Sequence, residues 1–272
     1  MTPAKKGCLL VIGGHEGKER ERLILTELAR RVRGGRLIVA TTASHDKVDE
    51  LWASYSRLFT ELGVKDVVHL NIGNRAHADA PAHLALIDKA GGIFFTGGDQ
   101  LKLTSDLGGT KLAERMLRFY REEGGFIAGT SAGAAMMSET MIITGRDEQT
   151  HRIGEQLSMA PGLGLLQNII VDQHFAERAR MGRLLAAVAQ NPRSLGIGID
   201  EDTAILVDGD EHFRVLGQGG VYVLDGRGMK WSNISEAKRH SALSVFGMCL
   251  HLLSHDDVFD LRTRAPVMTV AV

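Results

Sequence analysis

The sequence Phe126-Ile127-Ala128-Gly129-Thr130-Ser131-Ala132-Gly133 carries the clearest structural signal in the chain. Its apolar start predicts the end of a buried strand, its glycines permit a tight turn, and residues 134–137 (AAMM) predict a helix. A serine at the apex of such a turn lies beside helix N–H groups that can stabilise an oxyanion. The pattern predicts a serine hydrolase that transfers acyl groups. A G-x-S-x-G match also arises by chance or for packing reasons, so the rest of the chain must decide between these origins and a catalytic serine.

Apolar runs alternate with amphipathic segments upstream of this serine. The strands that we expect here cover residues 8–12, 37–41, 67–70, 93–95 and 126–128, and the helices cover about 18–33, 48–62, 81–89 and 112–123. This alternation predicts an α/β fold with a doubly wound, mostly parallel sheet. Gly13-Gly14, Gly97-Gly98 and Ser131 each follow a strand, so we expect them at the carboxyl edge of the sheet, where sites form.

A different pattern follows Gln167. A strand over 168–171 leads to a helix over 176–190, and four short strands over 195–199, 204–207, 212–216 and 221–224 have the turn spacing of antiparallel strands at a sheet edge. With no linker, repeat or low-complexity tract, residues 1–272 are expected to form a single peptidase domain.

The composition limits the classes of partner and compartment. The chain has 272 residues, 44% of them hydrophobic, and a net charge of −1, which is ordinary for a globular protein and gives no bulk attraction to nucleic acid or an anionic membrane. Cys8 and Cys249 lie in apolar runs and are expected to be buried free thiols. The apolar run after the polar start is too short for a signal peptide, so we expect a cytoplasmic protein. No His, Cys or carboxylate cluster has ligand spacing, and we expect no metal and no cofactor.

A serine nucleophile needs a base, and the base needs an orienting acid. Most of the eleven histidines lie in expected helices, loops or charged stretches, whereas His174 follows a strand end, in Asp172-Gln173-His174-Phe175. It is either the base or a packed strand-end residue. For the acid, Glu201 follows another strand end, although its acidic neighbours also fit a solvated turn; Asp147 and Glu148 are further candidates. The order Ser131, His174, Glu201 is not that of the α/β-hydrolases, so a different doubly wound fold is expected.

Two further motifs suggest recognition. The N–H groups near Gly98 and of Ala132 could form an oxyanion hole, although Asp99 could instead cap a helix. After His174, Arg178, Arg180 and Arg183 are expected at the start of a helix, where the dipole disfavours cations. They form either a solvated basic face or a site for carboxylates.

Several motifs together resemble the cyanophycinases, the exopeptidase branch of the serine peptidase family that also holds aspartyl dipeptidase. The resemblance runs from residue 12 to residue 201 and rests on these stretches: Ile12-Gly13-Gly14, Phe94-Phe95-Thr96-Gly97-Gly98-Asp99-Gln100, Gly129-Thr130-Ser131-Ala132-Gly133-Ala134, Asp172-Gln173-His174-Phe175, Glu177-Arg178-x-Arg180-x-Gly182-Arg183 and Gly198-Ile199-Asp200-Glu201. The first loop departs from it, since Gly13-Gly14-His15-Glu16-Gly17 stands where the family has Gly-Gly-Ala-Glu-Asp.

The resemblance implies a fold related to class I glutamine amidotransferases and a homodimer. It implies a Ser131–His174–Glu201 triad and hydrolysis of cyanophycin to β-Asp-Arg dipeptides. Substrate-binding positions carry over to Gln100, Asp172, Gln173, Arg178, Arg180 and Arg183. The alternatives are an aspartyl or isoaspartyl dipeptidase of the same family and a non-catalytic binding module on the same fold.

Overall fold

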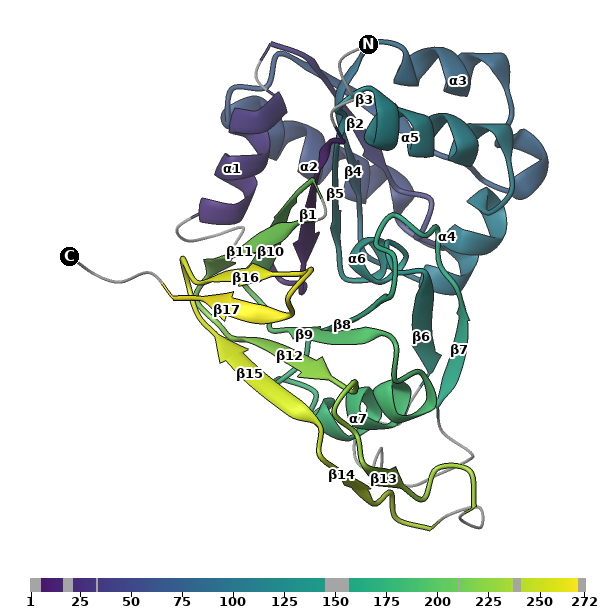
Figure 1. The fold of residues 1–272 in the computed structure, drawn as a ribbon. Helices are drawn as coiled ribbons and strands as arrows, with labels where there is room; N and C mark the ends of the chain where they lie inside the picture. Colours follow the sequence, from purple (N-terminus) through teal and green to yellow (C-terminus); the bar gives the residue numbers. More distant parts are fainter. Residues whose placement is uncertain are drawn as a thin grey trace.

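A nine-stranded sheet forms the frame of the molecule (Figure 1). The computed structural model describes residues 6–16, 22–32, 34–144, 157–209, 211–236 and 241–268. Five adjacent strands are parallel, in the order β1-β5-β4-β2-β3: β1 Cys8–Ile12, β2 Arg36–Ala40, β3 Asp66–Leu70, β4 Ala90–Phe95 and β5 Phe126–Thr130. Beyond β1 the sheet continues with antiparallel strands: β10 Thr203–Asp208, β11 His212–Gly217, β16 Val258–Asp260 and β17 Ala265–Val267.

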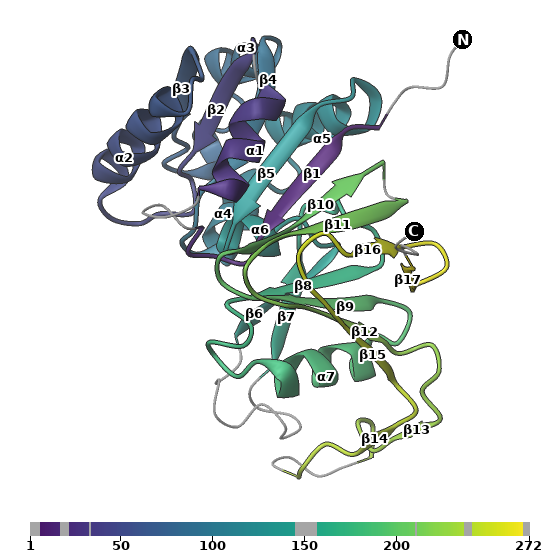
Figure 2. The same ribbon diagram turned by 90° about the vertical axis from the view of Figure 1, so that its left-hand side faces the viewer.

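Helices cover both faces of the parallel part (Figure 2). Because side chains alternate along a strand, Leu10 and Ile12 of β1 face one core and Leu9 and Val11 face the other. The first core includes α1 Leu23–Val32 and α2 Val48–Glu61; the second includes α3 Pro81–Ile87, α4 Gln100–Leu107, α5 Lys111–Glu122 and α6 Ala132–Ala135. A 3-10 turn, η1 Arg75–His77, precedes α3.

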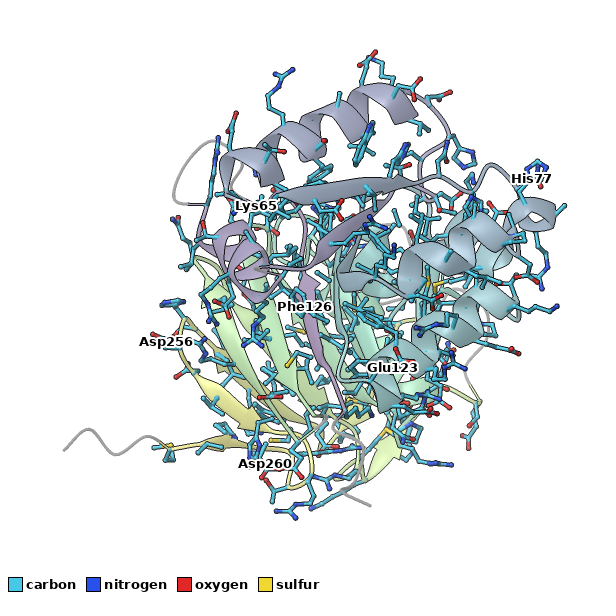
Figure 3. All side chains as sticks on the ribbon, turned by 90° about the horizontal axis from the view of Figure 1, so that it is seen from above. Lys65, His77, Glu123, Phe126, Asp256 and Asp260 are labelled. Atoms are coloured by element: carbon cyan, nitrogen blue, oxygen red, sulfur yellow. The ribbon has the colours of Figure 1, made fainter. Side chains whose placement is uncertain are left out.

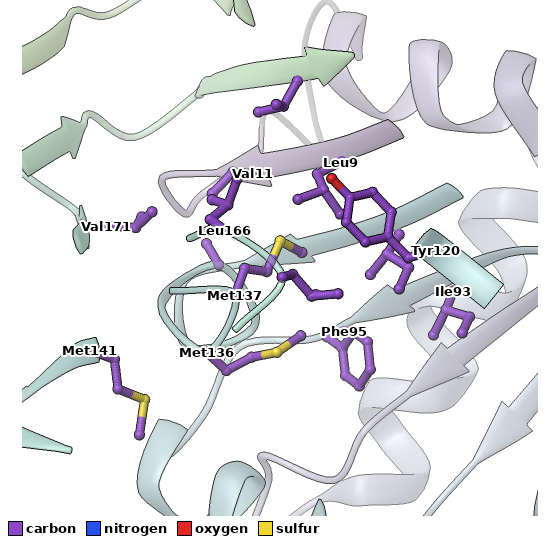
Figure 4. Close-up of a cluster of buried hydrophobic side chains, with 14 of the residues drawn as sticks. Leu9, Val11, Ile93, Phe95, Tyr120, Met136, Met137, Met141, Leu166 and Val171 are labelled. Carbon is purple, nitrogen blue, oxygen red and sulfur yellow. The ribbon is translucent and has the colours of Figure 1, made fainter. Parts of the chain in front are cut away.

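A second sheet of four strands packs below the first. Its order is β15-β12-β9-β8, with β8 Ile169–Gln173 parallel to β9 Leu195–Ile199, and with β12 Val221–Asp225 and β15 Cys249–Leu253 antiparallel. One face joins the second core of the large sheet, where Val171 lies near Met137 and Leu166 in Figure 4. The other face packs on α7 Met181–Gln190. Two small hairpins complete the fold: β6 Thr140–Thr144 with β7 Ser158–Pro161, and β13 Trp231–Ser232 with β14 Val245–Phe246.

Apolar side chains lie in the interior, and charged and polar side chains lie mostly at the surface. Figure 3 labels Phe126 in the body of the molecule, where it is 6% exposed, and His77 and Asp256 at its periphery. Within the described residues, none of the helices has the length and apolar character that a membrane span requires.

The predicted α/β class with a mostly parallel sheet is confirmed, but its division into two sheets was not predicted. The strands after residue 195 do not all lie at one sheet edge: β9 and β12 belong to the small sheet, and β10 and β11 extend the large one. Strand patterns alone do not specify pairing partners, so the crossing between sheets at residues 200–202 left no signal in the periodicity.

One helix begins later than predicted. The helix expected from Ala176 begins at Met181, and Ala179 in the preceding turns has a φ of 50°. Arg180 donates from its guanidinium to the Gln173 carbonyl at 2.6 Å, which holds these turns against the strand end. The prediction that the arginines occupy a first helical turn is therefore wrong for Arg178, which precedes the helix.

Candidate active site

Ser131 lies in a strained turn between β5 and α6. Its φ of 52° and ψ of −110° are unfavourable for a residue with a side chain, which is the strain expected of a nucleophile elbow. The turn is held in place because the Ser131 N–H donates to the Ile12 carbonyl at 3.0 Å. The Ser131 carbonyl accepts from the N–H groups of Ala134 and Ala135, which starts the short helix.

The predicted base contacts this serine, and the predicted acid contacts the base. Ser131 Oγ lies 3.0 Å from His174 Nε2, and His174 Nδ1 lies 2.6 Å from Glu201 Oε1. The side chains of His174 and Glu201 are 14% and 30% exposed, so the relay is partly shielded yet reachable. A carboxylate on one ring nitrogen orients the imidazole so that the other nitrogen can accept the serine proton. The alternative of a merely packed His174 does not account for these two contacts.

The three residues come from the junction of the two sheets. Ser131 follows β5 of the large sheet, His174 follows β8 of the small sheet, and Glu201 lies where the chain passes from β9 to β10. Gly13-Gly14, Gly97-Gly98 and Ser131 follow neighbouring parallel strands of the large sheet, as predicted, whereas His174 follows a strand of the small sheet. Asp200 stabilises the crossing, since its carboxylate accepts from the N–H groups of Ala176 and Gly220, both at 2.9 Å.

The loop after β1 bonds to the backbone of His174 and of the residue after Glu201. The Gly13 carbonyl accepts from the His174 N–H at 2.7 Å, and the Gly14 carbonyl accepts from the Asp202 N–H at 3.0 Å. Gly14 has a φ of 115°, and a Cβ there would lie 2.2 Å from the His174 ring. Only glycine fits, so this loop seats the imidazole. Its role was not evident from the sequence, in which Gly13-Gly14 lacks the pattern of a phosphate loop.

The predicted oxyanion donors belong to two segments, and one of them directly follows Ser131. Ala132 is the first residue of α6, and the N–H group at this position of a helix has no carbonyl acceptor within the helix. In the other segment, Gly97 lines the cavity at Ser131, and Gly98 packs against the backbone of Ala43. Asp99 caps α4 by accepting from the N–H groups of Leu101 and Lys102. Asp99 is therefore a helix cap, which was one of the two interpretations of this motif.

Four of the six predicted substrate-binding residues form a buried network behind His174. The carboxylate of Asp172 accepts two hydrogen bonds from the Arg183 guanidinium, one of them from Nε to Oδ2 at 2.6 Å. Arg180 donates to the side-chain oxygen of Gln173 at 2.9 Å. The exposed fractions of Asp172, Gln173, Arg180 and Arg183 range from 1% to 6%. Asp172 pairs with Arg183 and lies 3.6 Å from Arg180, so both guanidinium groups have partners within the protein, and of the three arginines Arg178 is the exposed one.

The remaining predicted residues are spread more widely. Arg178 is exposed in the turns after His174, and its N–H donates to the His174 carbonyl at 3.2 Å. Gln100 donates from its amide to the carbonyls of Ile142 and Ile143, tying α4 to the β6 strand. The alternative acids Asp147 and Glu148 lie outside the described residues.

A cavity of about 1050 Å³ opens at Ser131 and His174. Its wall carries four carboxylates, those of Glu16, Asp46, Glu50 and Asp202, together with Lys47. None of the six predicted substrate-binding residues, all of which are described, lines it. Sequence reasoning missed the acidic wall because Asp46 and Glu50 belong to the segment that enters α2, far along the chain from the serine. For Glu16 a signal was available in the sequence, because this glutamate closely follows Gly13-Gly14 at a strand end.

The fold and the relay define a class: α/β enzymes that attack a carbonyl carbon with a serine hydroxyl. The family model described as peptidase family S51 matches residues 9–215, and the chain belongs to this family of serine-type peptidases.

Named relatives extend over nearly the whole chain. The sequence is 38% identical over 261 residues to a cyanophycinase of Synechococcus elongatus. This alignment covers 95% of this chain and 80% of that protein. It is 35% identical over 268 residues to a cyanophycinase of Geminocystis herdmanii, with 98% of each chain covered. The crystal structure of a peptidase from an acI-B1 Actinobacterium has a TM-score of 0.62 at 23% identity, over 89% of this chain and 98% of that one. This last similarity supports the fold alone.

Proposed function

We propose that this peptidase hydrolyses cyanophycin, a polymer with an aspartate backbone and an arginine on each side-chain carboxylate, and releases β-Asp-Arg dipeptides from its end. The observation that carries the proposal is the identity of 35–38% to cyanophycinases over 95% or more of the chain. A further support is the acidic cavity beside Ser131, because guanidinium groups are complementary to its carboxylates.

In the proposed reaction, Ser131 Oγ attacks the backbone carbonyl carbon while His174 Nε2 takes the hydroxyl proton. Glu201 orients the ring and stabilises the imidazolium that forms. The N–H groups of Ala132 and Gly98 are the proposed donors to the oxyanion. His174 then gives its proton to the leaving amine, and a water molecule hydrolyses the acyl-enzyme by the same route in reverse.

Both signs of charge in the substrate have proposed partners. The guanidinium groups of the polymer meet Asp46, Glu50 and Asp202 in the cavity wall, and a substrate carboxylate meets the exposed Arg178 beside His174. The remaining predicted positions bond to the protein itself, and their proposed role is to shape the substrate site. Gln100 fixes the start of α4, and the loop that carries His174 is fixed by Asp172, Gln173, Arg180 and Arg183.

Incubation with purified cyanophycin and mass analysis of the products tests the proposal. The expected first product is β-Asp-Arg, formed by the wild type and absent with Ser131→Ala. Free arginine as the first product would contradict the proposed bond. Turnover of soluble Asp-X dipeptides with the polymer left intact would favour the aspartyl dipeptidase alternative.

The proposal also includes a homodimer and a cytoplasmic location. The resemblance to the cyanophycinases supports the dimer. Cys8 and Cys249 are free thiols, which fits a reducing compartment, although neither is buried as predicted: Cys8 is partly buried and Cys249 is exposed. Light scattering after size exclusion should give twice the chain mass of 29.5 kDa; a mass of one chain would refute the dimer.

A further inference from the structure

A buried carboxylate in the cavity wall is not used by the triad chemistry. Glu16 is only 3% exposed, and it follows the Gly13-Gly14 loop. Its Oε2 accepts from the Thr130 hydroxyl at 2.7 Å, and its Oε1 accepts from the Tyr55 hydroxyl. A carboxylate that is removed from water needs such donors, so these contacts stabilise one orientation of the side chain.

The two donors come from different elements, whose apolar residues share one core. Thr130 is the last residue of β5 and directly precedes Ser131, whereas Tyr55 belongs to α2. Burial and the neighbouring carboxylate raise the pKa of the Tyr55 hydroxyl well above its ordinary value of 10.0, so Tyr55 stays a neutral donor in the working range of pH.

Glu16 belongs to the loop that holds the relay. The Ile12 carbonyl accepts from the Ser131 N–H, and the Gly13 carbonyl accepts from the His174 N–H. A shift of this loop relative to β5 would therefore change the position of the base relative to the nucleophile. Glu16 opposes such a shift, because it ties this loop to the residue before Ser131.

We propose that Glu16 is a positioning residue, whose hydrogen bonds with Thr130 and Tyr55 fix the 3.0 Å contact between Ser131 Oγ and His174 Nε2. The inference rests on the proposed role of Ser131 as nucleophile and does not depend on which polymer or peptide is cleaved. A misplacement of about 1 Å in a reacting group costs on the order of 100-fold in rate.

The test is the rate at which a fluorophosphonate probe labels Ser131, measured beside kcat and KM on cyanophycin. Glu16→Gln keeps the shape but replaces an acceptor oxygen with a donor, and we expect labelling and kcat to fall together by about 10-fold to 100-fold. KM should change by less than about threefold, since a positioning defect alters the reacting atoms rather than binding. Glu61→Gln, at the exposed end of α2, is the matched control and should label at the wild-type rate.

A second pair of variants guards against a folding defect. Thr130→Val removes the donor at nearly constant volume and should slow labelling, and Thr130→Ser, which keeps the hydroxyl, should recover most of the lost rate. Wild-type labelling by a folded Glu16→Gln protein, or equal labelling of the Val and Ser variants, would overturn the proposal. A wild type that hydrolyses cyanophycin but is not labelled would instead refute the serine mechanism on which the proposal depends.

Discussion

Gly14→Ala is the substitution whose effect follows most directly from the geometry. The added methyl group would lie 2.2 Å from His174 Cε1, 2.5 Å from Nε2 and 2.8 Å from Nδ1. Ordinary contact begins at 3.4 Å, so the imidazole must retreat by roughly 1 Å or the loop must move by the same amount.

Either movement breaks the relay. The Ser131–His174 contact of 3.0 Å would lengthen beyond hydrogen-bond distance, and the contact of 2.6 Å with Glu201 would be disturbed as well. We expect kcat to fall by about 100-fold or more. The backbone φ of 115° at this position adds a cost of about 1–2 kcal/mol to folding for any residue with a Cβ.

The assay is steady-state release of β-Asp-Arg together with thermal unfolding of the same preparations. Gly73→Ala is the matched control, because nothing lies within 4 Å of a Cβ at that position, and it should keep full activity. A folded Gly14→Ala protein with more than half of the wild-type kcat would refute the reasoning that this loop seats the base.

Three further predictions test the relay, the buried network and a surface charge cluster. Glu201→Gln should reduce kcat by about 10²-fold to 10⁴-fold with little loss of stability, since the amide cannot stabilise the imidazolium; an unchanged kcat would remove Glu201 from the relay. Asp172→Asn should lower the free energy of unfolding by about 3–5 kcal/mol, because it removes the negative charge that faces the buried guanidinium of Arg183; a raised KM at unchanged stability would show direct substrate contact instead. The Glu27 pKa is about 2, mainly because of its hydrogen bond from Arg30, so wild type should be more stable than Glu27→Gln above pH 4.5, and the difference should vanish as the pH falls toward 2; a difference independent of pH would contradict this.

The local structure was largely predictable because it depends on short-range signals. Strand β1 was predicted at its observed bounds, and the helix expected over 48–62 is α2 Val48–Glu61. The strand, turn and helix around Ser131 were predictable because glycine and apolar patterning specify them together. The positions of His174 and Glu201 after strand ends made them candidates for the base and the acid, and the structure brings His174 into contact with both Ser131 and Glu201.

Long-range pairing was not predictable from the same signals. Nothing in the spacing of residues 172–183 distinguishes an arginine that faces a substrate from one that pairs with Asp172 in the interior. The helix start at Met181 depends on the contact of Arg180 with Gln173, which forms only in the folded chain. The Glu16 hydrogen bonds join residues 114 and 39 positions apart, beyond the reach of any local pattern.

The most direct test of the central claim, that Ser131 is a nucleophile activated by His174, is the site of covalent labelling. Wild-type protein treated with a fluorophosphonate probe, then digested and mapped by mass spectrometry, should carry one adduct on the peptide that contains Ser131. Labelling should be lost in Ser131→Ala and strongly slowed in His174→Ala. An adduct on another residue, or His174→Ala labelled at the wild-type rate, would contradict the account.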